Sequence, residues 1–239
     1  MSVATATVLI TGGAAGIGLA IAHAATRRGA RALIWDINAA RLDRAAAELP
    51  GCKTLCADIS DPDAVIDAFA RGPAPTHLVN NAGILGPDMA LNAADADAID
   101  RVLAVNLRGA MLVTSGFLNA RTEHPTASIV NMSSIAGFNG GARGRAVYGA
   151  TKGAMLALTQ AMARDLAPAL RVNALAPGII DTEIQAGLFA GRAALEAATA
   201  SIPAARLGQP SEVASAAEWL LFDAAYVTGE VIRVAGGRK

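Results

Sequence analysis

Two side chains four residues apart, Tyr148 and Lys152, could exchange a proton with an alcohol or carbonyl oxygen. Their spacing puts both on one face of a helix, which the Ala-rich segment beginning YGATK is predicted to form. A free tyrosine has a pKa of roughly 10, and a nearby ammonium group favours its phenolate form. Lowering that pKa by about 2–3 units requires about 3–4 kcal/mol of differential stabilisation. The pair predicts general acid–base catalysis, with an incidental helix pair as the alternative for so short a motif.

Further polar groups lie just before this helix. A predicted strand ends in Asn131-Met132-Ser133-Ser134, and a serine hydroxyl there could orient a carbonyl group. The Gly-rich segment 137–144 that follows is predicted to be an active-site loop. Arg143 and Arg145 could bind a carboxylate or another polar end of a substrate, or they could be solvated loop cations.

A glycine-rich turn follows the first predicted strand, in the sequence TGGAAGIG from Thr11 to Gly18. Such a turn lets the backbone approach a pyrophosphate, and the N-terminus of the next helix offers N–H groups and a partial positive charge. The spacing is G-x-x-x-G-x-G, so a plain tight turn is the alternative to a dinucleotide site.

An aspartate ends the second predicted strand, 18 residues past Gly18. The Asp36 carboxylate could accept hydrogen bonds from the adenosine ribose hydroxyls and would repel a 2′-phosphate. No Arg or Lys lies between Gly13 and Ile17, so the sequence favours NAD over NADP. A loop carboxylate without a ligand is the alternative.

Short β-rich runs alternate with longer Ala-rich helical stretches along the whole chain, and this alternation must position these groups. Consecutive apolar residues in several runs are typical of strands that are covered on both faces. The pattern predicts an α/β fold, a doubly wound parallel sheet of Rossmann type with helices on both faces, in one domain of residues 1–239. The expected strands are Thr7–Thr11, Ala32–Asp36, Thr54–Ala57, Thr76–Asn80, Ser128–Ser133, Arg171–Ala176 and Val231–Val234.

The composition excludes several other classes of protein. Lys plus Arg and Asp plus Glu number 20 each, and no basic block predicts nucleic-acid binding. No uninterrupted apolar run reaches about 18 residues and the N-terminus is unlike a signal peptide, so we expect a cytoplasmic protein without a membrane span. The three histidines are far apart, and no metal site is predicted. Cys52 and Cys56 are expected on one strand, facing the same side as small buried side chains.

Taken together, these motifs resemble the short-chain dehydrogenase/reductase family across nearly the whole chain. Seven or eight motifs occur in the family's order, which makes the resemblance highly specific. They are TGGAAGIG at Thr11–Gly18, Asp58-Ile59, NNAG at Asn80–Gly83, VNLRG around Asn106, NMSSIAG around Ser134, YGATK at Tyr148–Lys152, PGIIDT at Pro177–Thr182 and VTGEVIRVAGG near the end.

The resemblance implies catalytic roles for four residues. Tyr148 is similar to the family's general acid/base, and Lys152 to the residue that holds the nicotinamide ribose and lowers the tyrosine pKa. Asn106 resembles the asparagine that bends a helix and anchors a water for proton relay. Ser134 resembles the substrate-orienting serine. The interval from Ser134 to Tyr148 is 14 residues, one longer than the common family pattern, so Ser133 is the alternative.

The resemblance also implies a cofactor site that uses Tyr148 and Lys152 in addition to residues of the βα turns. Asp58 and Ile59 would flank adenine, Asn81 would lie beside the adenosine ribose, and Ile180 with Thr182 would hold the carboxamide and phosphate region. The implied cofactor residues in these turns are Gly12, Ala15, Gly16, Ile17, Gly18, Asp36, Asp58, Ile59, Asn81, Gly83, Ile180 and Thr182.

The sequence thus predicts an NAD-dependent oxidoreductase that transfers a hydride between nicotinamide and a secondary alcohol or ketone. Two alternatives stay open, an NADP-linked reductase of 3-oxoacyl thioesters and a non-catalytic nucleotide sensor on the same fold. The mostly apolar segment 183–205 is expected to be a substrate lid.

An assembly is also predicted. Ala150, Ala154, Ala157 and Ala161 lie opposite the catalytic face of the Tyr148 helix, and a helix that is apolar all round is buried on both sides. We expect a homo-oligomer, a tetramer as is frequent in the family, with the contact made by this helix or by the one around Asp97–Leu118.

Overall fold

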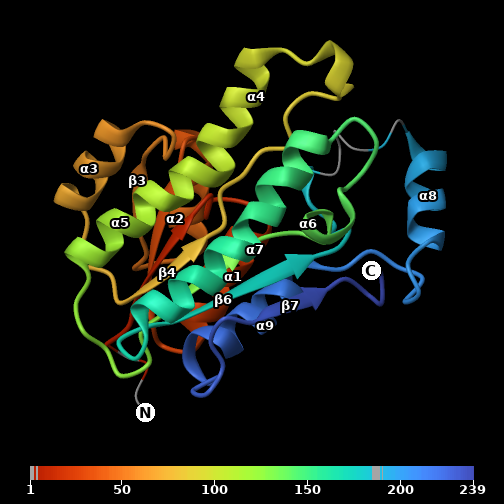
Figure 1. The fold of residues 1–239 in the computed structure, drawn as a ribbon. Coiled ribbons are helices and arrows are strands. Elements are labelled where there is room, and N and C mark those ends of the chain that lie inside the picture. The colour runs from red at the N-terminus through yellow and green to blue at the C-terminus, as the bar shows by residue number, and fades with distance from the viewer. Residues whose placement is uncertain (1–2, 4, 185–188, 190) are drawn as a thin grey trace.

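The computed structural model describes residues 3, 5–184, 189 and 191–239, and a seven-stranded parallel sheet forms its centre (Figure 1). The strand order is β3-β2-β1-β4-β5-β6-β7, and every pairing is parallel. The predicted doubly wound fold is therefore confirmed, and the strand order reverses between β1 and β4. The strands are β1 (Thr7–Thr11), β2 (Arg31–Asp36), β3 (Lys53–Cys56), β4 (His77–Asn80), β5 (Ser128–Met132), β6 (Arg171–Pro177) and β7 (Val231–Val234).

Helices cover both faces of the sheet because successive strand residues point to opposite sides. Val8 and Ile10 of β1 pack in one apolar core with α1 (Gly16–Arg27), α2 (Ala39–Glu48) and α9 (Pro210–Phe222). Leu9 lies between them in sequence and belongs to the opposite core. That core contains residues of α3 (Pro62–Arg71), α5 (Ala110–Ala120) and α7 (Ala146–Leu166).

A long helix runs from α4 (Ala96–Leu103) through the π-helical turn η2 (Ala104–Gly109) into α5. Its 25 residues, Ala96–Ala120, are long and apolar enough to cross a membrane by length and mean hydropathy. The search of the sequence for uninterrupted apolar runs did not find this segment, because polar residues interrupt it. A helix in the core of a soluble protein can have the same length and hydropathy. In this fold Val113 and Phe117 of the helix are buried in the second core against the sheet.

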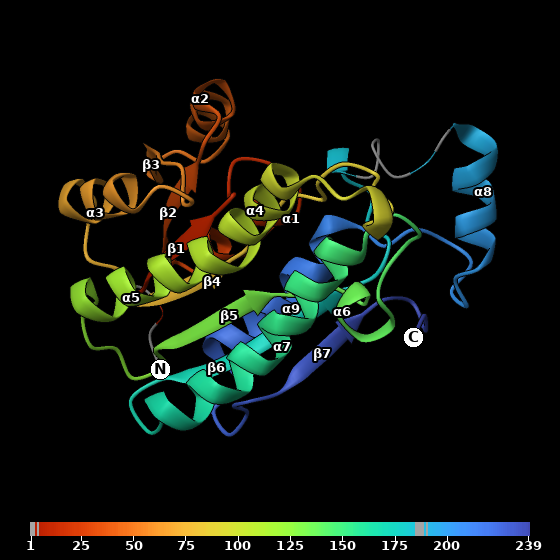
Figure 2. The same cartoon turned by 45° about the horizontal axis from the view of Figure 1, so that its top comes forward.

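The remaining elements lie toward the carboxyl ends of the later strands. A short helix α6 (Ala136–Asn139) precedes α7, and the 3₁₀ turn η1 (Leu91–Ala93) precedes α4. Figure 2 shows α8 (Arg192–Ala200) standing apart from the body of the molecule, with the C-terminus near α6. The Asn139 side-chain amide donates to the carbonyl oxygen of Lys239 at 2.9 Å.

One prediction about the cysteines is wrong. Cys52 precedes β3 rather than lying on it, and Cys56 is exposed. The reason is that β3 is an edge strand in which Leu55 alone is buried. Both cysteines are free thiols.

Candidate active site

The glycine turn after β1 and the NNAG segment after β4 meet at the point where the strand order reverses, which is where ligands bind in open α/β sheets. A Cβ atom added to Gly12, whose φ is +59°, would lie 2.9 Å from the Cα of Ala82. A Cβ on Gly18 would lie 2.7 Å from the Asn81 side-chain nitrogen. Only glycine fits at these two positions, so the two segments form one closely packed wall.

The N-terminus of α1 is suited to hold a phosphate. Its N-cap residue, Ala15, has no side chain that could accept from the first-turn N–H groups, and that turn contains no acidic residue. On the other side, the Thr182 side chain approaches Gly16, with its Cγ2 atom 3.3 Å from where a Cβ would lie. Uncapped N–H groups with a hydroxyl-bearing side chain opposite fit a pyrophosphate. Ile180, two residues earlier, is buried, and its carbonyl accepts from the Thr182 hydroxyl at 3.3 Å.

Asn81 braces this turn. Its side-chain amide donates to the carbonyl oxygens of Thr11 and Gly12 at 3.0 and 2.9 Å. The Thr11 hydroxyl accepts from the backbone N–H groups of Asn81 and Ala82 at 3.1 and 3.2 Å. Sequence reasoning missed Thr11, although its position at the last residue of β1, directly before the first glycine, is a signal for such a role.

Three residues besides Asn81 were expected around the adenosine. The Asp36 carboxylate ends β2 and accepts from the N–H groups of Ala14 and Asn38 at 3.2 and 3.0 Å, each through one oxygen. Each oxygen keeps a lone pair for a ribose hydroxyl. Asp58 accepts from both the N–H and the hydroxyl of Ser60. The Ile59 side chain lies in the apolar core, and its place beside adenine stays a prediction.

The catalytic tyrosine candidate lies in the first turn of α7 and faces Ser134. Burial raises the pKa of Tyr148, and a hydrogen bond with the Ser134 side chain lowers it in part. The Ser133 hydroxyl donates instead to the carbonyl oxygen of Lys152 at 2.7 Å. The geometry therefore favours Ser134 over Ser133 as the residue beside Tyr148.

Lys152 is buried near Tyr148, with 4% of its surface exposed. Its ammonium donates to the Met132 carbonyl oxygen at 2.8 Å and lies 5.7 Å from the centre of the Tyr148 ring. Burial lowers the pKa of Lys152 to about 8. Ser134 lowers the pKa of Tyr148 in this structure, and a lowering by Lys152 stays a prediction.

Asn106 lies in the π-helical turn η2, the kind of irregularity at which helices bend, and is buried. Its side chain donates to the Ile84 carbonyl at 2.9 Å and to the Thr151 hydroxyl at 3.1 Å, and it accepts from the Ile84 N–H at 2.8 Å. A Cβ on Gly83 would lie 3.3 Å from the Asn106 side-chain oxygen and 3.4 Å from the Lys152 ammonium. Asn106 and Lys152 therefore flank the same glycine.

The two arginines of the loop before α7 differ in environment. Arg143 is exposed, whereas Arg145 is buried and its guanidinium donates to the carbonyl oxygen of Gly86.

Sequence reasoning also missed Thr151, which precedes Lys152 and binds Asn106. The expected lid at 183–205 contains α8, none of whose residues is buried, while residues 185–188 and 190 lie outside the described part of the chain.

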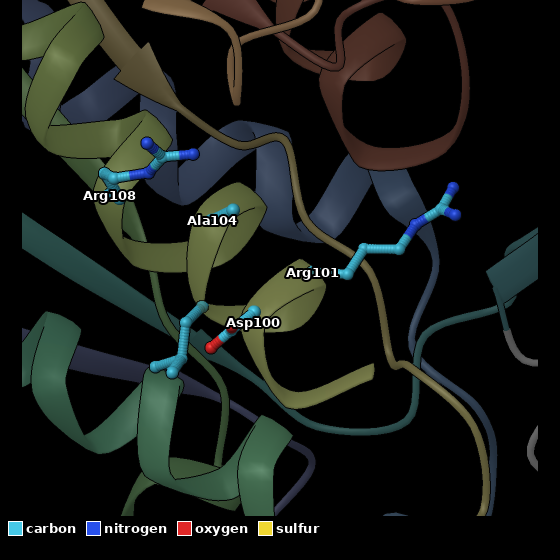
Figure 3. A pocket seen from close by; sticks show the side chains of 5 residues that line it. Asp100, Arg101, Ala104 and Arg108 are labelled. Carbon is cyan, nitrogen blue, oxygen red and sulfur yellow. The ribbon is translucent and has the colours of Figure 1, made fainter. Parts of the chain in front are cut away.

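The hollow in Figure 3 is separate from this site. It has a volume of about 510 Å³ and lies along α4 and η2, where Leu103 is 37% exposed. None of the residues placed at the catalytic centre lines it. Its lining residues are Asp100, Arg101, Leu103, Ala104 and Arg108.

Comparison with known proteins gives the class. Residues 12–239 match the family model described as enoyl-(acyl carrier protein) reductase. The chain is 38% identical to 2-(S)-hydroxypropyl-CoM dehydrogenase 3 of Xanthobacter autotrophicus, over 96% of this chain and 95% of that protein. It is 38% identical to galactitol 2-dehydrogenase (L-tagatose-forming) of Cereibacter sphaeroides, over 95% of this chain and 92% of that protein.

A solved structure agrees with these sequence matches. It is a gluconate 5-dehydrogenase candidate from Beutenbergia cavernae with NADP bound at low occupancy, and it superimposes with a TM-score of 0.89 at 35% identity, over 99% of this chain and 97% of that one. The chain belongs to the short-chain dehydrogenase/reductase family. It is an oxidoreductase of that family, for substrates of the alcohol or ketone type.

Proposed function

We propose that this protein is an NAD-dependent dehydrogenase that interconverts a secondary alcohol and its ketone. The observation that carries the cofactor preference is the free lone pairs of Asp36 at the end of β2, beside a glycine turn without basic residues. A carboxylate there accepts from ribose hydroxyls and repels the 2′-phosphate of NADP. The relatives named for 2-(S)-hydroxypropyl-CoM and galactitol support a hydroxyl-bearing substrate.

The chain's own residues carry out the proton chemistry of this proposal. A bound nicotinamide supplies or accepts the hydride. In the oxidising direction the Tyr148 phenolate takes the hydroxyl proton of the substrate, and Ser134 donates a hydrogen bond to the same oxygen. Lys152 holds the nicotinamide ribose. The second lone pair of the Asn106 side-chain oxygen accepts from a water that passes the proton outward from Lys152.

The cofactor proposal is tested by comparing NAD and NADP. The panel is 2-butanol, galactitol, gluconate and a 3-hydroxyacyl thioester, each read by the absorbance of the reduced cofactor. We expect wild-type kcat/KM to favour NAD at least about tenfold, which equals about 1.4 kcal/mol. Asp36→Ala should shrink the preference, whereas Asp43→Ala, an exposed carboxylate on α2, should keep it. Equal kcat/KM for both cofactors in the wild type would refute the proposal.

A second candidate is an NADP-linked reductase of 3-oxoacyl thioesters. The description of the matching family model and the NADP in the Beutenbergia structure favour it. The same panel separates the two, because this candidate requires the thioester to be the best substrate and NADP the better cofactor. The third candidate, a nucleotide sensor without catalysis, requires that the wild type turn over no faster than Tyr148→Phe. We expect that variant to lose turnover while it still binds NADH.

A further inference from the structure

We infer that Arg145 is a positioning residue that joins the first turn of α7, which carries Tyr148, to the segment 84–89 that follows β4. The kinetic part of this inference rests on the proposed dehydrogenase function, but the structural part does not. Arg145 is the N-cap residue of α7, and its carbonyl oxygen accepts from the Gly149 N–H at 2.9 Å. Its backbone thus forms part of the turn that holds the tyrosine.

The Arg145 side chain reaches across to the other segment. It is 8% exposed, and its guanidinium donates to the carbonyl oxygen of Gly86. Arginine is rarely this buried unless it is paired, because desolvating its charge costs free energy that partners must offset. A buried arginine with a backbone carbonyl as partner is therefore a fixed link between two loops rather than a freely moving surface charge.

Two further contacts join the same pair of loops. The Met89 N–H donates to the Gly144 carbonyl oxygen at 3.0 Å. The Asp88 carboxylate lies directly against Gly144, at the place where a Cβ would be, so a side chain there would push the loops apart. Both contacts lie on one side of the Arg145 link, since Gly144 directly precedes Arg145 while Asp88 and Met89 follow Gly86.

The other end of the segment is held from a different helix. Both backbone groups of Ile84 bind the Asn106 side chain in η2, and Gly83, next to Ile84, lies against the Lys152 ammonium. The segment therefore begins at the catalytic centre and is fixed at Ile84, Gly86 and Met89. Loss of the middle link would free a wall of the site from the helix that carries Tyr148.

The test uses the full chain and a matched neighbour. Arg145→Met roughly keeps the length of the side chain and removes its donors. Arg145→Lys keeps the charge and a single donor nitrogen, and Arg143→Met removes an exposed arginine of the same loop. Hydrogen–deuterium exchange of peptides covering 84–89 and of peptides covering β5 is compared between the variants. NADH affinity is measured by fluorescence, and kcat with the panel alcohol that the wild type oxidises fastest.

We expect Arg145→Met to raise exchange at least about tenfold in 84–89 and to leave β5 unchanged. The same variant should lower kcat at least about tenfold with the NADH Kd within about twofold. Arg145→Lys should recover part of the exchange protection and part of kcat, and Arg143→Met should leave the exchange of 84–89 unchanged. Unchanged exchange in 84–89, or an equal rise in β5, would overturn the inference. If Arg145→Met does not fold, the exchange of Arg145→Lys against Arg143→Met decides it in the same way. A wild type without hydride transfer would refute the proposed function, and the exchange data would still decide the role of Arg145.

Discussion

The Asn106 side-chain amide donates to the hydroxyl of Thr151 at 3.1 Å, and this bond joins the π-helical turn η2 to the residue before Lys152. Together with the two bonds to Ile84, it places one asparagine between the segment after β4 and helix α7. The catalytic helix is therefore positioned from a second helix as well as from the sheet.

We predict that Asn106→Leu destabilises the protein by about 1–3 kcal/mol, because both backbone groups of Ile84 lose a partner at a partly buried site. Activity should fall much further than for Thr151→Val, which removes one hydrogen bond and keeps the shape of the side chain. Thermal unfolding and turnover of the two variants measure this. Equal effects of the two substitutions would contradict the prediction.

Substitution of Ser134 should shift the pH profile of alcohol oxidation. The bond with Ser134 lowers the pKa of Tyr148, so Ser134→Ala raises that pKa, and the rising limb of the rate must move to higher pH. Ser133→Ala is the matched control, since its hydroxyl binds the Lys152 carbonyl. We expect a shift to higher pH for Ser134→Ala alone. If the pH profile moved equally in both variants, Ser134 would not be the residue that lowers the pKa of Tyr148.

His77 should make the protein less stable in acid. Burial, the neighbouring His124 and Arg171 lower the pKa of His77 to about 3, and its ring nitrogens bind Thr76 and Thr126. Between about pH 6.5 and pH 3 the unfolded chain binds a proton at this residue that the folded chain does not bind. The free energy of unfolding therefore decreases as the pH is lowered through that window, by up to about 1.4 kcal/mol per pH unit from this group.

Urea unfolding at several pH values measures this slope. His77→Gln should flatten it relative to the wild type. The difference between variants isolates His77 from the carboxylates, which titrate in the same range. An identical slope in His77→Gln and the wild type would rule His77 out.

We propose a homo-oligomer, a tetramer, with α7 and the helix 96–120 at its contacts. Ala150 and Ala157 of α7 are exposed in the single chain, as are Leu103 and Met111, at 37% and 44%. Light scattering at micromolar concentration should show a multiple of the chain mass. Ala154→Arg should reduce it, whereas Ala47→Arg on α2 should not. A monomeric mass for the wild type would exclude the assembly.

Much of the fold could be predicted because its signals are local. Consecutive apolar residues such as Val8-Leu9-Ile10 require a strand buried on both faces, and β1 and β7 have the predicted bounds. The exposure of Cys56 could not be predicted in this way, because it depends on β3 lying at the sheet edge. Strand order is set by packing between elements that are distant in the sequence.

The site shows the same limit. Helical spacing put Tyr148 and Lys152 on one face and the family resemblance added Asn106, which in the structure binds Thr151 and lies with Lys152 against Gly83. Their partners could not be read from spacing, because Lys152 binds the carbonyl of Met132, and Arg145 that of Gly86. Any residue offers a backbone carbonyl, so no residue type marks such a partner in a sequence.

The contact between Gly16 and Thr182 has a consequence for how the protein is made. These residues are more than half of the chain apart, and the strands that carry them to the same edge are not neighbours in the sheet. Contacts of such long sequence separation form late in folding, since the loop-closure entropy must be offset first. An unfinished chain released before β6 would lack one side of the phosphate groove. A cofactor that bound between Gly16 and Thr182 would therefore require the completed fold, and it would stabilise that fold by mass action, by about 2.7 kcal/mol at 100 times its Kd.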